Sequence, residues 1–420
     1  MSHEAILLII LMIGWFFVSY NSGLISGTLK LIISEFKLSS TESGLLLSSW
    51  LLGMLLGASI MGYISDKIGR KKTLLINLLI LGFFSFLSSL SHNLLELILV
   101  RFIAGISASG YMVVASVLLS EFVGKTKRGL FVVILESSWA LGWLASLIIT
   151  RIFIVVVNWR EIFYTSLMTL SLIPIFLFGV PESYRFLISK GYLDEAKEIV
   201  AKYNVDVNLH IITSSRKKHS IFDLFDKNYR KRTIMLWIHW FCIVLAYWGM
   251  FLWLPTILSA KGLSFIESIE YAIIITTAQI PGYLSVAYLI EKLGRKYTLS
   301  LYMILGGLGS LLFWYSNNNL ILLLSGILVS FFNLGAWGAT YTYTPELYPT
   351  DIRGFASGWA NSIGRIGGFL GPNIVGYMMA LTGDPLYPFL VFAMVHFISG
   401  ITVCVLGIET KGKELEEISR

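Results

Sequence analysis

The chain has 420 residues, 56% of them hydrophobic and only 14% charged, with a net charge of +7. Soluble proteins carry about 25% charged residues, and a soluble core of this chain length does not hide so much apolar surface. The composition therefore excludes a soluble enzyme, a disordered chain and a secreted disulfide scaffold, and it predicts an all-α membrane protein.

Apolar runs long enough to cross a membrane occur in two sets of six. A bilayer core of about 30 Å needs roughly 20 such residues per helix. The first set falls near residues 6–29, 41–64, 72–91, 94–119, 129–150 and 160–179. The second set falls near residues 233–258, 264–290, 297–315, 320–344, 354–381 and 386–407. The sequence therefore predicts twelve transmembrane helices in two pseudo-symmetric six-helix bundles, residues 1–180 and residues 233–420, the second including a short tail.

Residues 181–232 form the long polar stretch between the two bundles and are predicted to be a cytoplasmic linker. Within it, residues 193–203 have the pattern of a short amphipathic helix, which we expect to lie on the membrane surface. The first apolar run begins almost at Met1 and lacks both a basic segment and a small-residue cleavage site. We therefore expect a retained helix and not a signal peptide.

Lysine and arginine residues are distributed unequally between the two sides of the predicted membrane. Of the 32, 25 fall in the connections after the even-numbered helices and in the C-terminal tail, and five fall on the opposite side. Cytoplasmic loops carry such an excess. We therefore expect a multi-pass protein of the plasma membrane with both termini in the cytoplasm. The excess positive charge indicates contact with membrane lipid and not with nucleic acid.

The two halves of the sequence repeat each other at one constant offset, without a gap from the first helix to the fifth. The matched pairs include Asp66 with Glu291, Arg70 with Arg295, Glu121 with Glu346, Arg128 with Arg353, and Gly142 with Gly367. Because six spans separate equivalent positions, the halves have the same topology and are related by an axis along the membrane normal. This arrangement is typical of proteins that rock two helix bundles about a central site.

The connection after the second predicted helix carries the motif GYISDKIGRKK at residues 62–72, and the connection after the eighth repeats it as EKLGRK at residues 291–296. The motif resembles the loop 2–3 signature of the major facilitator superfamily. The motifs RFIAG, PELYPTDIRG, PESYRFL and ETKG, which begin at residues 101, 345, 181 and 409, resemble those of the sugar-porter branch and its relatives. These relatives include aromatic-acid symporters, nicotinate permeases and organic-ion transporters. The resemblance covers essentially the whole chain and implies a secondary transporter that works by alternating access.

Eight charged residues at these connections are predicted to form a conformational latch. They are Asp66, Arg70, Glu121 and Arg128 in the first half, and Glu291, Arg295, Glu346 and Arg353 in the second. A carboxylate at such a position can cap a helix start or pair with a basic group across the seam between the bundles. A pair across the seam holds in one conformation only, so it can act as a latch. The alternative is a tight turn whose charges only follow the membrane topology.

Three ionisable residues lie inside predicted spans, where a charge costs at least ~2.5–3.5 kcal/mol and therefore indicates function. They are Arg101, Glu136 and Arg365. Glu136 and Arg365 lie on equivalent helices of the two halves, and we expect them to approach a central site from opposite walls. We hypothesise that Glu136 carries a coupling proton and that Arg365 binds a negative group of the substrate. The alternative is that the two residues pair with each other or with backbone and only hold the bundle together.

The resemblance has implications for Asn21, Arg101 and Glu136. Proton-coupled sugar porters place an aspartate where this chain has Asn21, whereas facilitative sugar carriers lack that carboxylate. The likeness suggests a proton-coupling role for Arg101, with a structural contact between the first and fourth helices as the alternative. Sugar porters also have a sugar-contacting glutamine where this chain has Glu136, so a hexose is disfavoured as the substrate.

Aromatic and amide side chains suggest a binding pocket in the second half. Asn333, Trp337 and Tyr341 recur every four residues and share one helix face, and Tyr247 and Trp248 lie on the seventh predicted helix. Such rings can form a flat-sided pocket for an aromatic ligand, although the same stripes also serve packing and lipid contact. Gln279 and Asn361 are uncharged polar residues in mid-span, which suits hydrogen bonds to a ligand. His239, near the start of the seventh helix, is interpreted as an interface or core histidine.

The sequence therefore predicts a monomeric secondary transporter whose partners are a small-molecule substrate, protons and membrane lipid. The predicted reaction is proton symport of an aromatic or heteroaromatic monocarboxylate. A sugar or organic-cation carrier, working as a facilitator, is the alternative, and a non-transporting membrane sensor is a remote one. The sequence has no phosphate loop, metal cluster or nucleophile–base set. We therefore expect that the protein is not an enzyme and binds no cofactor or metal.

Overall fold

The computed structural model describes residues 2–124, 128–203, 219–349 and 352–412, together with the backbone but not the side chain of Arg128. The chain divides into two compact units. Unit 1 comprises Met1–Thr28 and Ser49–Arg216, and unit 2 comprises Leu29–Ser48 and Lys217–Arg420. The predicted bundle boundaries at residues 180 and 233 stay a prediction, because this division follows contacts and not the order of the chain.

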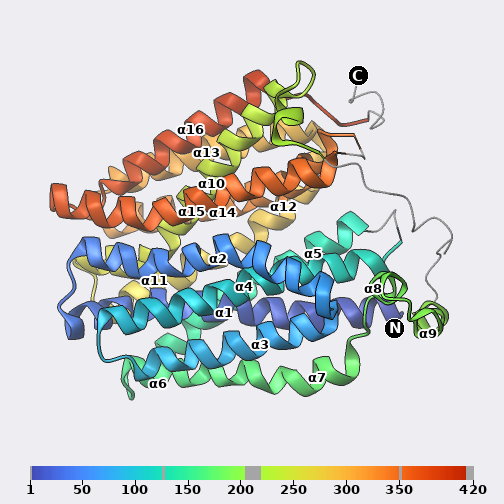
Figure 1. The fold of residues 1–420 in the computed structure, drawn as a ribbon. Helices are drawn as coiled ribbons and strands as arrows, with labels where there is room; N and C mark the ends of the chain where they lie inside the picture. Colours follow the sequence, from blue (N-terminus) through green and yellow to red (C-terminus); the bar gives the residue numbers. More distant parts are fainter. Residues whose placement is uncertain (1, 125–127, 204–218, 350–351, 413–420) are drawn as a thin grey trace. The chain divides into compact units, whose positions relative to one another are not determined.

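Helices make up nearly all of the described ranges (Figure 1). The first group is α1 (His3–Phe36), α2 (Ser40–Ile68), α3 (Arg70–Leu87), η1 (Ser88–Leu90), α4 (Leu94–Phe122), α5 (Arg128–Phe153), α6 (Trp159–Tyr164), η2 (Thr165–Ser171), α7 (Leu172–Gly179), α8 (Tyr184–Ser189) and α9 (Leu193–Tyr203). The second group is η4 (Ile221–Phe225), α10 (Arg230–Ala260), α11 (Phe265–Thr277), α12 (Gln279–Leu293), α13 (Arg295–Trp314), α14 (Asn319–Glu346), α15 (Arg353–Thr382) and α16 (Pro388–Leu406).

Eleven helical segments of the described chain are long and apolar enough to cross a membrane. Besides α3, which continues into η1 at its end, two of them are compound: α6, η2 and α7 form one segment, and α11 and α12 form another. The long helix α15 falls below that apolarity because glycine, asparagine and arginine recur along it. With α15 included, the twelve long segments match the twelve predicted spans, and the all-α membrane fold is confirmed.

Both compound segments contain a local break in the helix. Pro281 has no N–H to donate to the carbonyl of Thr277, which is where α11 ends, and α12 begins at Gln279. In the sixth span, the middle turns are 3₁₀ and not α-helical over Thr165–Ser171. There the hydroxyls of Thr165 and Thr169 lie within hydrogen-bond distance of α1 side chains, at 2.5 Å and 2.9 Å. Residues of both breaks thus turn polar groups toward the interior of their own unit.

Glycines allow helix backbones to touch at equivalent places in the two halves. A Cβ atom at Gly142 of α5 would lie 2.2 Å from the carbonyl oxygen of Phe16 in α1. A Cβ atom at Gly367 of α15 would lie 2.3 Å from the carbonyl oxygen of Phe241 in α10. The same offset that matches Asp66 with Glu291 relates the two glycines to each other and the two phenylalanines to each other. The repeat found in the sequence is therefore also a repeat of helix packing.

The predicted amphipathic helix at residues 193–203 exists and is α9. Its expected place on the membrane surface stays a prediction, and part of its apolar face packs within unit 1. Ala196 is buried and Ile199 partly buried against the apolar side chains of α8, Phe186, Leu187 and Ile188. These residues of α9 pack against α8 because only three residues separate the two helices.

Candidate functional site

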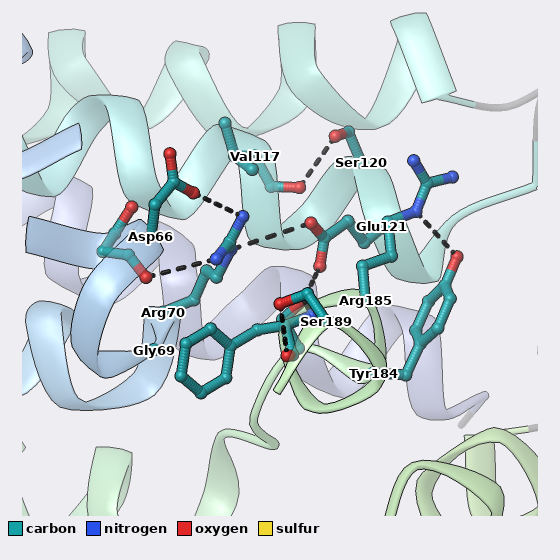
Figure 2. Close-up of polar contacts among 12 residues, drawn as sticks. Asp66, Gly69, Arg70, Val117, Ser120, Glu121, Tyr184, Arg185 and Ser189 are labelled. Carbon is teal, nitrogen blue, oxygen red and sulfur yellow. Dashed lines mark hydrogen bonds and ion pairs between the residues drawn. The ribbon is translucent and has the colours of Figure 1, made fainter. Parts of the chain in front are cut away.

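The turn between α2 and α3 gathers three of the predicted latch residues of unit 1 around one guanidinium (Figure 2). An Arg70 Nη2 lies 2.8 Å from an Asp66 carboxylate oxygen, and Nε lies 3.8 Å from a Glu121 carboxylate oxygen. The same guanidinium donates to the carbonyl of Ser65 at 3.1 Å. Arg70 therefore ties the end of α2 and the start of α3 to the end of α4.

A carboxylate from beyond the sixth span completes this cluster. Glu182 accepts the backbone N–H groups of Arg70 at 2.7 Å and of Lys71 at 3.3 Å, so it caps the first turn of α3. The hydroxyl of Ser183 donates to the carboxylate of Glu121. Gly69 has a φ of 101°, and a Cβ atom there would lie 2.2 Å from a Glu182 oxygen. The turn therefore needs glycine both for its backbone conformation and for the approach of Glu182.

Unit 2 builds the same cluster from equivalent residues. Arg295 pairs with Glu291 at 3.0 Å and with Glu346 at 3.3 Å. Its backbone N–H donates to Glu409 at 2.9 Å, and Gly294 before it has a φ of 96°. Thr410 donates its hydroxyl to Glu346 at 2.6 Å. Six of the eight predicted latch residues are thus brought together, three in each unit.

The other two predicted latch residues differ from these. The side chain of Arg128 lies outside the described residues. Arg353 donates from Nε to the carbonyl of Tyr348 at 3.2 Å, within its own connection. It therefore secures the start of α15, whereas Glu346 in the same connection pairs with Arg295.

Four capping residues of the site were not predicted from the sequence: Glu182, Ser183, Glu409 and Thr410. Their motifs indicated only the family resemblance. A signal was present, because the spacing from Glu182-Ser183 to Glu409-Thr410 is only slightly longer than the repeat offset. Allowing one small insertion in the repeat places both pairs at the ends of equivalent spans.

Arg101 and Asn21 meet inside unit 1, between α4 and α1. Arg101 is 1% exposed, and its Nη1 donates to the backbone carbonyl of Asn21 at 3.0 Å. The guanidinium carbon lies 4.2 Å from the ring centroid of Trp50. The amide of Asn21 donates to Phe17 and to Thr169, at 2.7 Å and 2.9 Å. Within the described residues, this cation is held by a carbonyl and an aromatic face.

Glu136 is buried on α5, and Trp139 and Trp143 follow it by about one and two helical turns on the same face. The rings of Trp139 and Trp143 have their centroids 6.2 Å apart. The carbonyl of Trp139 accepts the hydroxyl of Ser19 at 2.6 Å, so this stretch of α5 packs directly on α1. The structure therefore places a buried carboxyl group on the stretch of α5 that carries these two tryptophans.

An aromatic cluster lies between α10 and α14 in unit 2. The Trp337 ring lies edge-on to Trp240 and Tyr247, with centroids 5.7 Å and 6.0 Å away. Tyr341 lies 5.4 Å from Trp240 and 5.7 Å from Trp337. Tyr247 also contacts Trp248 at 5.7 Å. Four predicted residues thus come together, and Trp240 is a fifth member that the prediction left out.

The arginine and amide side chains predicted for unit 2 differ in their hydrogen bonds. Arg365 donates from Nε to the side-chain oxygen of Asn361 at 3.3 Å, one turn earlier on α15. Gln279 is fully buried at the start of α12, and its amide has no hydrogen-bond partner in the part of the chain that the structure describes. Asn333 pairs with His396 of α16. Across the described ranges, no group of three His, Cys, Asp or Glu side chains could hold a metal ion.

A membrane fold of two repeated helix sets, each with the same charged turn, defines a secondary transporter of the major facilitator type. The chain matches the family described as "Sugar (and other) transporter" over residues 6–420, and it belongs to that family. It is therefore a multi-pass membrane protein that transports a small molecule, and not an enzyme.

Two curated relatives cover nearly the whole chain. The niacin transporter NiaP of Acinetobacter baylyi is 36% identical over 413 residues, which span 97% of this chain and 94% of the relative. The putative niacin/nicotinamide transporter NiaP of Bacillus subtilis is 38% identical over 409 residues, 96% of each chain. Among solved structures, the E. coli xylose transporter XylE in a partially occluded inward-open conformation has a TM-score of 0.81 at 18% identity, covering 99% of this chain and 100% of that one. The likeness to XylE concerns the fold alone.

Proposed function

We propose that this transporter moves a heteroaromatic monocarboxylate, nicotinate being the first candidate, by proton symport across the plasma membrane. The observation that carries the proposal is the aromatic cluster of unit 2, together with two relatives named for niacin transport over nearly the same length. Flat rings of Trp240, Trp337 and Tyr341 suit stacking on a pyridine ring.

In this proposal, the substrate carboxylate binds to Arg365, whose planar guanidinium can hold both oxygens. The Asn361 oxygen 3.3 Å from Arg365 Nε orients the guanidinium, and the amide of Gln279 supplies hydrogen bonds to the ligand. The coupling proton binds to Glu136, a buried carboxyl group on α5. The charged turn clusters, whose ion pairs each lie within one unit, hold that unit rigid as the protein alternates between its two open forms. A latch across the seam between the bundles stays a prediction.

The transporter works as a monomer in anionic lipid, with both termini in the cytoplasm, as the distribution of lysine and arginine residues favours.

A facilitated carrier is the second candidate, and one observation favours it. Asn21 is neutral, and its amide already donates to Phe17 and Thr169. An amide in that role cannot exchange a proton with Arg101. If Glu136 also keeps a fixed charge during transport, the protein equilibrates its substrate and does not concentrate it.

Uptake of labelled nicotinate into proteoliposomes, with and without an inward proton gradient, tests the proposal. We expect gradient-driven accumulation in the natural protein and its loss in Glu136→Gln, whereas exchange of nicotinate at equal pH on both sides persists. The exposed Glu161→Gln is the matched control and retains accumulation. Equilibration without any effect of the gradient would establish a facilitator. Flux of an amine or a sugar, with none of nicotinate, would overturn the substrate.

A further inference from the structure

Unit 2 contains two buried histidines that the proposed transport mechanism does not use. His239 of α10 and His396 of α16 both have 0% exposure. Ionisable side chains at membrane depth are expensive to bury, and they mark sites of proton or ligand chemistry. Their hydrogen bonds define which ring nitrogen carries a proton and which partner can respond to a second one.

His239 is fixed by hydroxyl groups at both ring nitrogens. The hydroxyl of Thr340 donates to the carbonyl of Ala336 at 2.7 Å, so its oxygen accepts from His239 Nε2 at 2.7 Å. Ser399 lies 2.7 Å from Nδ1 and donates its hydroxyl to that nitrogen when the ring is neutral. Thr340 accepts from Nε2 in both charge states, and the Ser399 hydroxyl can rotate to accept from a protonated Nδ1, so neither partner distinguishes the neutral from the charged ring.

His396 has partners that do distinguish its charge states. Nδ1 lies 2.6 Å from the carbonyl of Phe392, and because a carbonyl only accepts, Nδ1 carries a hydrogen. Nε2 lies 2.9 Å from the amide nitrogen of Asn333, which only donates, so Nε2 is the unprotonated acceptor. The ring is therefore neutral in this arrangement. The side-chain oxygen of Asn333 is buried and has no hydrogen-bond partner in the described parts of the chain.

Protonation of His396 at Nε2 would place two donors face to face. Rotation of the Asn333 amide by half a turn removes this conflict, because the side-chain oxygen then accepts from Nε2. The amide nitrogen moves to where the oxygen had been. Ser330 lies one turn earlier on α14, and its buried hydroxyl also has no partner within the described residues, so its oxygen can accept there. The amide thus has one orientation for each charge state of the ring.

We propose that His396 and Asn333 form a proton-binding site inside unit 2, in which the amide orientation of Asn333 reports the protonation of His396 to the substrate-binding aromatic cluster. Trp337 follows Asn333 by one helical turn, and its indole nitrogen lacks a partner in the described chain. A change of the amide therefore acts on the ring that packs against Trp240 and Tyr247.

Among the described residues that face His396, His239 is the other titratable group. From α13, Gly306 and Gly307 lie against the ring, and a Cβ atom at Gly306 would lie 2.9 Å from its Cδ2. From α14 the facing side chain is Asn333, and from α10 it is His239, which interacts electrostatically with His396. Because two charged rings would repel each other, the pair takes up at most one proton.

The test is a titration of tryptophan fluorescence of the full-length protein in detergent, without substrate, between about pH 4.5 and 8.5. In a Glu136→Gln background, which removes titration of that carboxyl group, we expect one transition. It should be absent when His396→Gln is added, because that side chain can still meet Asn333 but does not titrate. Asn333→Asp should raise the midpoint by about 1 pH unit or more, since a carboxylate favours the protonated ring. The exposed His92→Gln is the matched control and leaves the midpoint unchanged.

The proposal is overturned if the Glu136→Gln background shows no transition, or if the transition keeps its midpoint when His396→Gln is added. Where His396→Gln does not fold, an unshifted midpoint in Asn333→Asp is sufficient to overturn it. The inference rests on the proposed function only for its link to the substrate. A transition that follows His396 in a protein without nicotinate flux would leave the proton site standing and remove the proposed substrate.

Discussion

Arg101 and Arg365 are two membrane-embedded arginines that the structure treats differently. Arg101 is enclosed, with Trp50 against its guanidinium and a single backbone carbonyl as its hydrogen-bond partner in the described chain. A cation over a tryptophan face gains about 2 kcal/mol or more when desolvated, so these contacts offset much of the cost of burial. Arg365 remains partly exposed, with Asn361 one turn away. Only the second arginine is accessible to a ligand, which is why the substrate carboxylate is assigned to it.

Replacing Arg365 by glutamine should therefore remove the preference for an acid over its amide. A hydrogen bond to a charged group is worth about 1.5–3 kcal/mol, which corresponds to roughly a ten- to hundredfold weaker binding of nicotinate. Nicotinamide has the same ring without the charge, so its binding should change little. Competition of both compounds against labelled nicotinate, in the natural protein and in Arg365→Gln, measures the two affinities. Equal losses for acid and amide would indicate a structural role for Arg365.

Helix α3 shows how a distant residue can define the start of an element. Its first N–H groups have no acceptor in their own chain segment, because an α-helix leaves its first turn unpaired. Glu182 supplies the acceptor from a position 112 residues later than Arg70. Glu409 does the same for α13 in unit 2. The ends of the sixth and twelfth spans are thus fastened to the turns that begin α3 and α13.

Glu182→Ala should lower the thermal stability of the protein. Loss of a helix cap costs about 0.5–2 kcal/mol, and here it also releases Arg70 and Lys71 from a charged partner. The melting temperature of the protein in detergent, followed by intrinsic fluorescence, is the measurement. Glu195→Ala, an exposed carboxylate on α9, serves as the control. If both variants melt together, the cap contributes nothing to stability.

The positions of the spans were predictable from the sequence, whereas interactions between distant residues were not. Apolar run length placed most helix ends within a few residues, for example 264–290 against 265–293 for α11 with α12. The break inside that segment had a signal in Pro281. The pair of Asn333 and His396 had none, because they are 63 residues apart and no periodicity relates them. The cover of α9 by α8 was also missed, since a hydrophobic stripe does not specify what it packs against.

At the scale of the whole molecule, the repeat extends to individual backbone contacts. A Cβ atom at Gly57 would lie 2.1 Å from the carbonyl oxygen of Ile106, and one at Gly282 would lie 2.2 Å from that of Phe331. The constant offset of the sequence repeat carries both members of the first pair onto those of the second. Because the two halves repeat with the same topology, we expect one charge asymmetry to apply to both.

Single cysteines test the predicted orientation. In a background without Cys242 and Cys404, we expect a membrane-impermeant maleimide to label Asn317→Cys in intact cells. The same reagent should label Glu195→Cys only after the cells are permeabilised. Both positions are exposed in the structure, so that access to the reagent and not burial decides the result. Labelling in the opposite order would reverse the assigned sidedness.

Helix α15 has a consequence for how the protein is made. Gly364, Gly367 and Gly371 lie against α10, and the polar residues of α15 keep it below the apolarity of the other long helices. A translocon releases segments into lipid according to their apolarity, so α15 has little drive to leave on its own. The earlier-synthesised α10 must then already lie in the bilayer, with the face that contacts α15 still uncovered. Biogenesis of the second half is therefore expected to be ordered, with α10 acting as the docking template that draws the least lipophilic helix into the membrane.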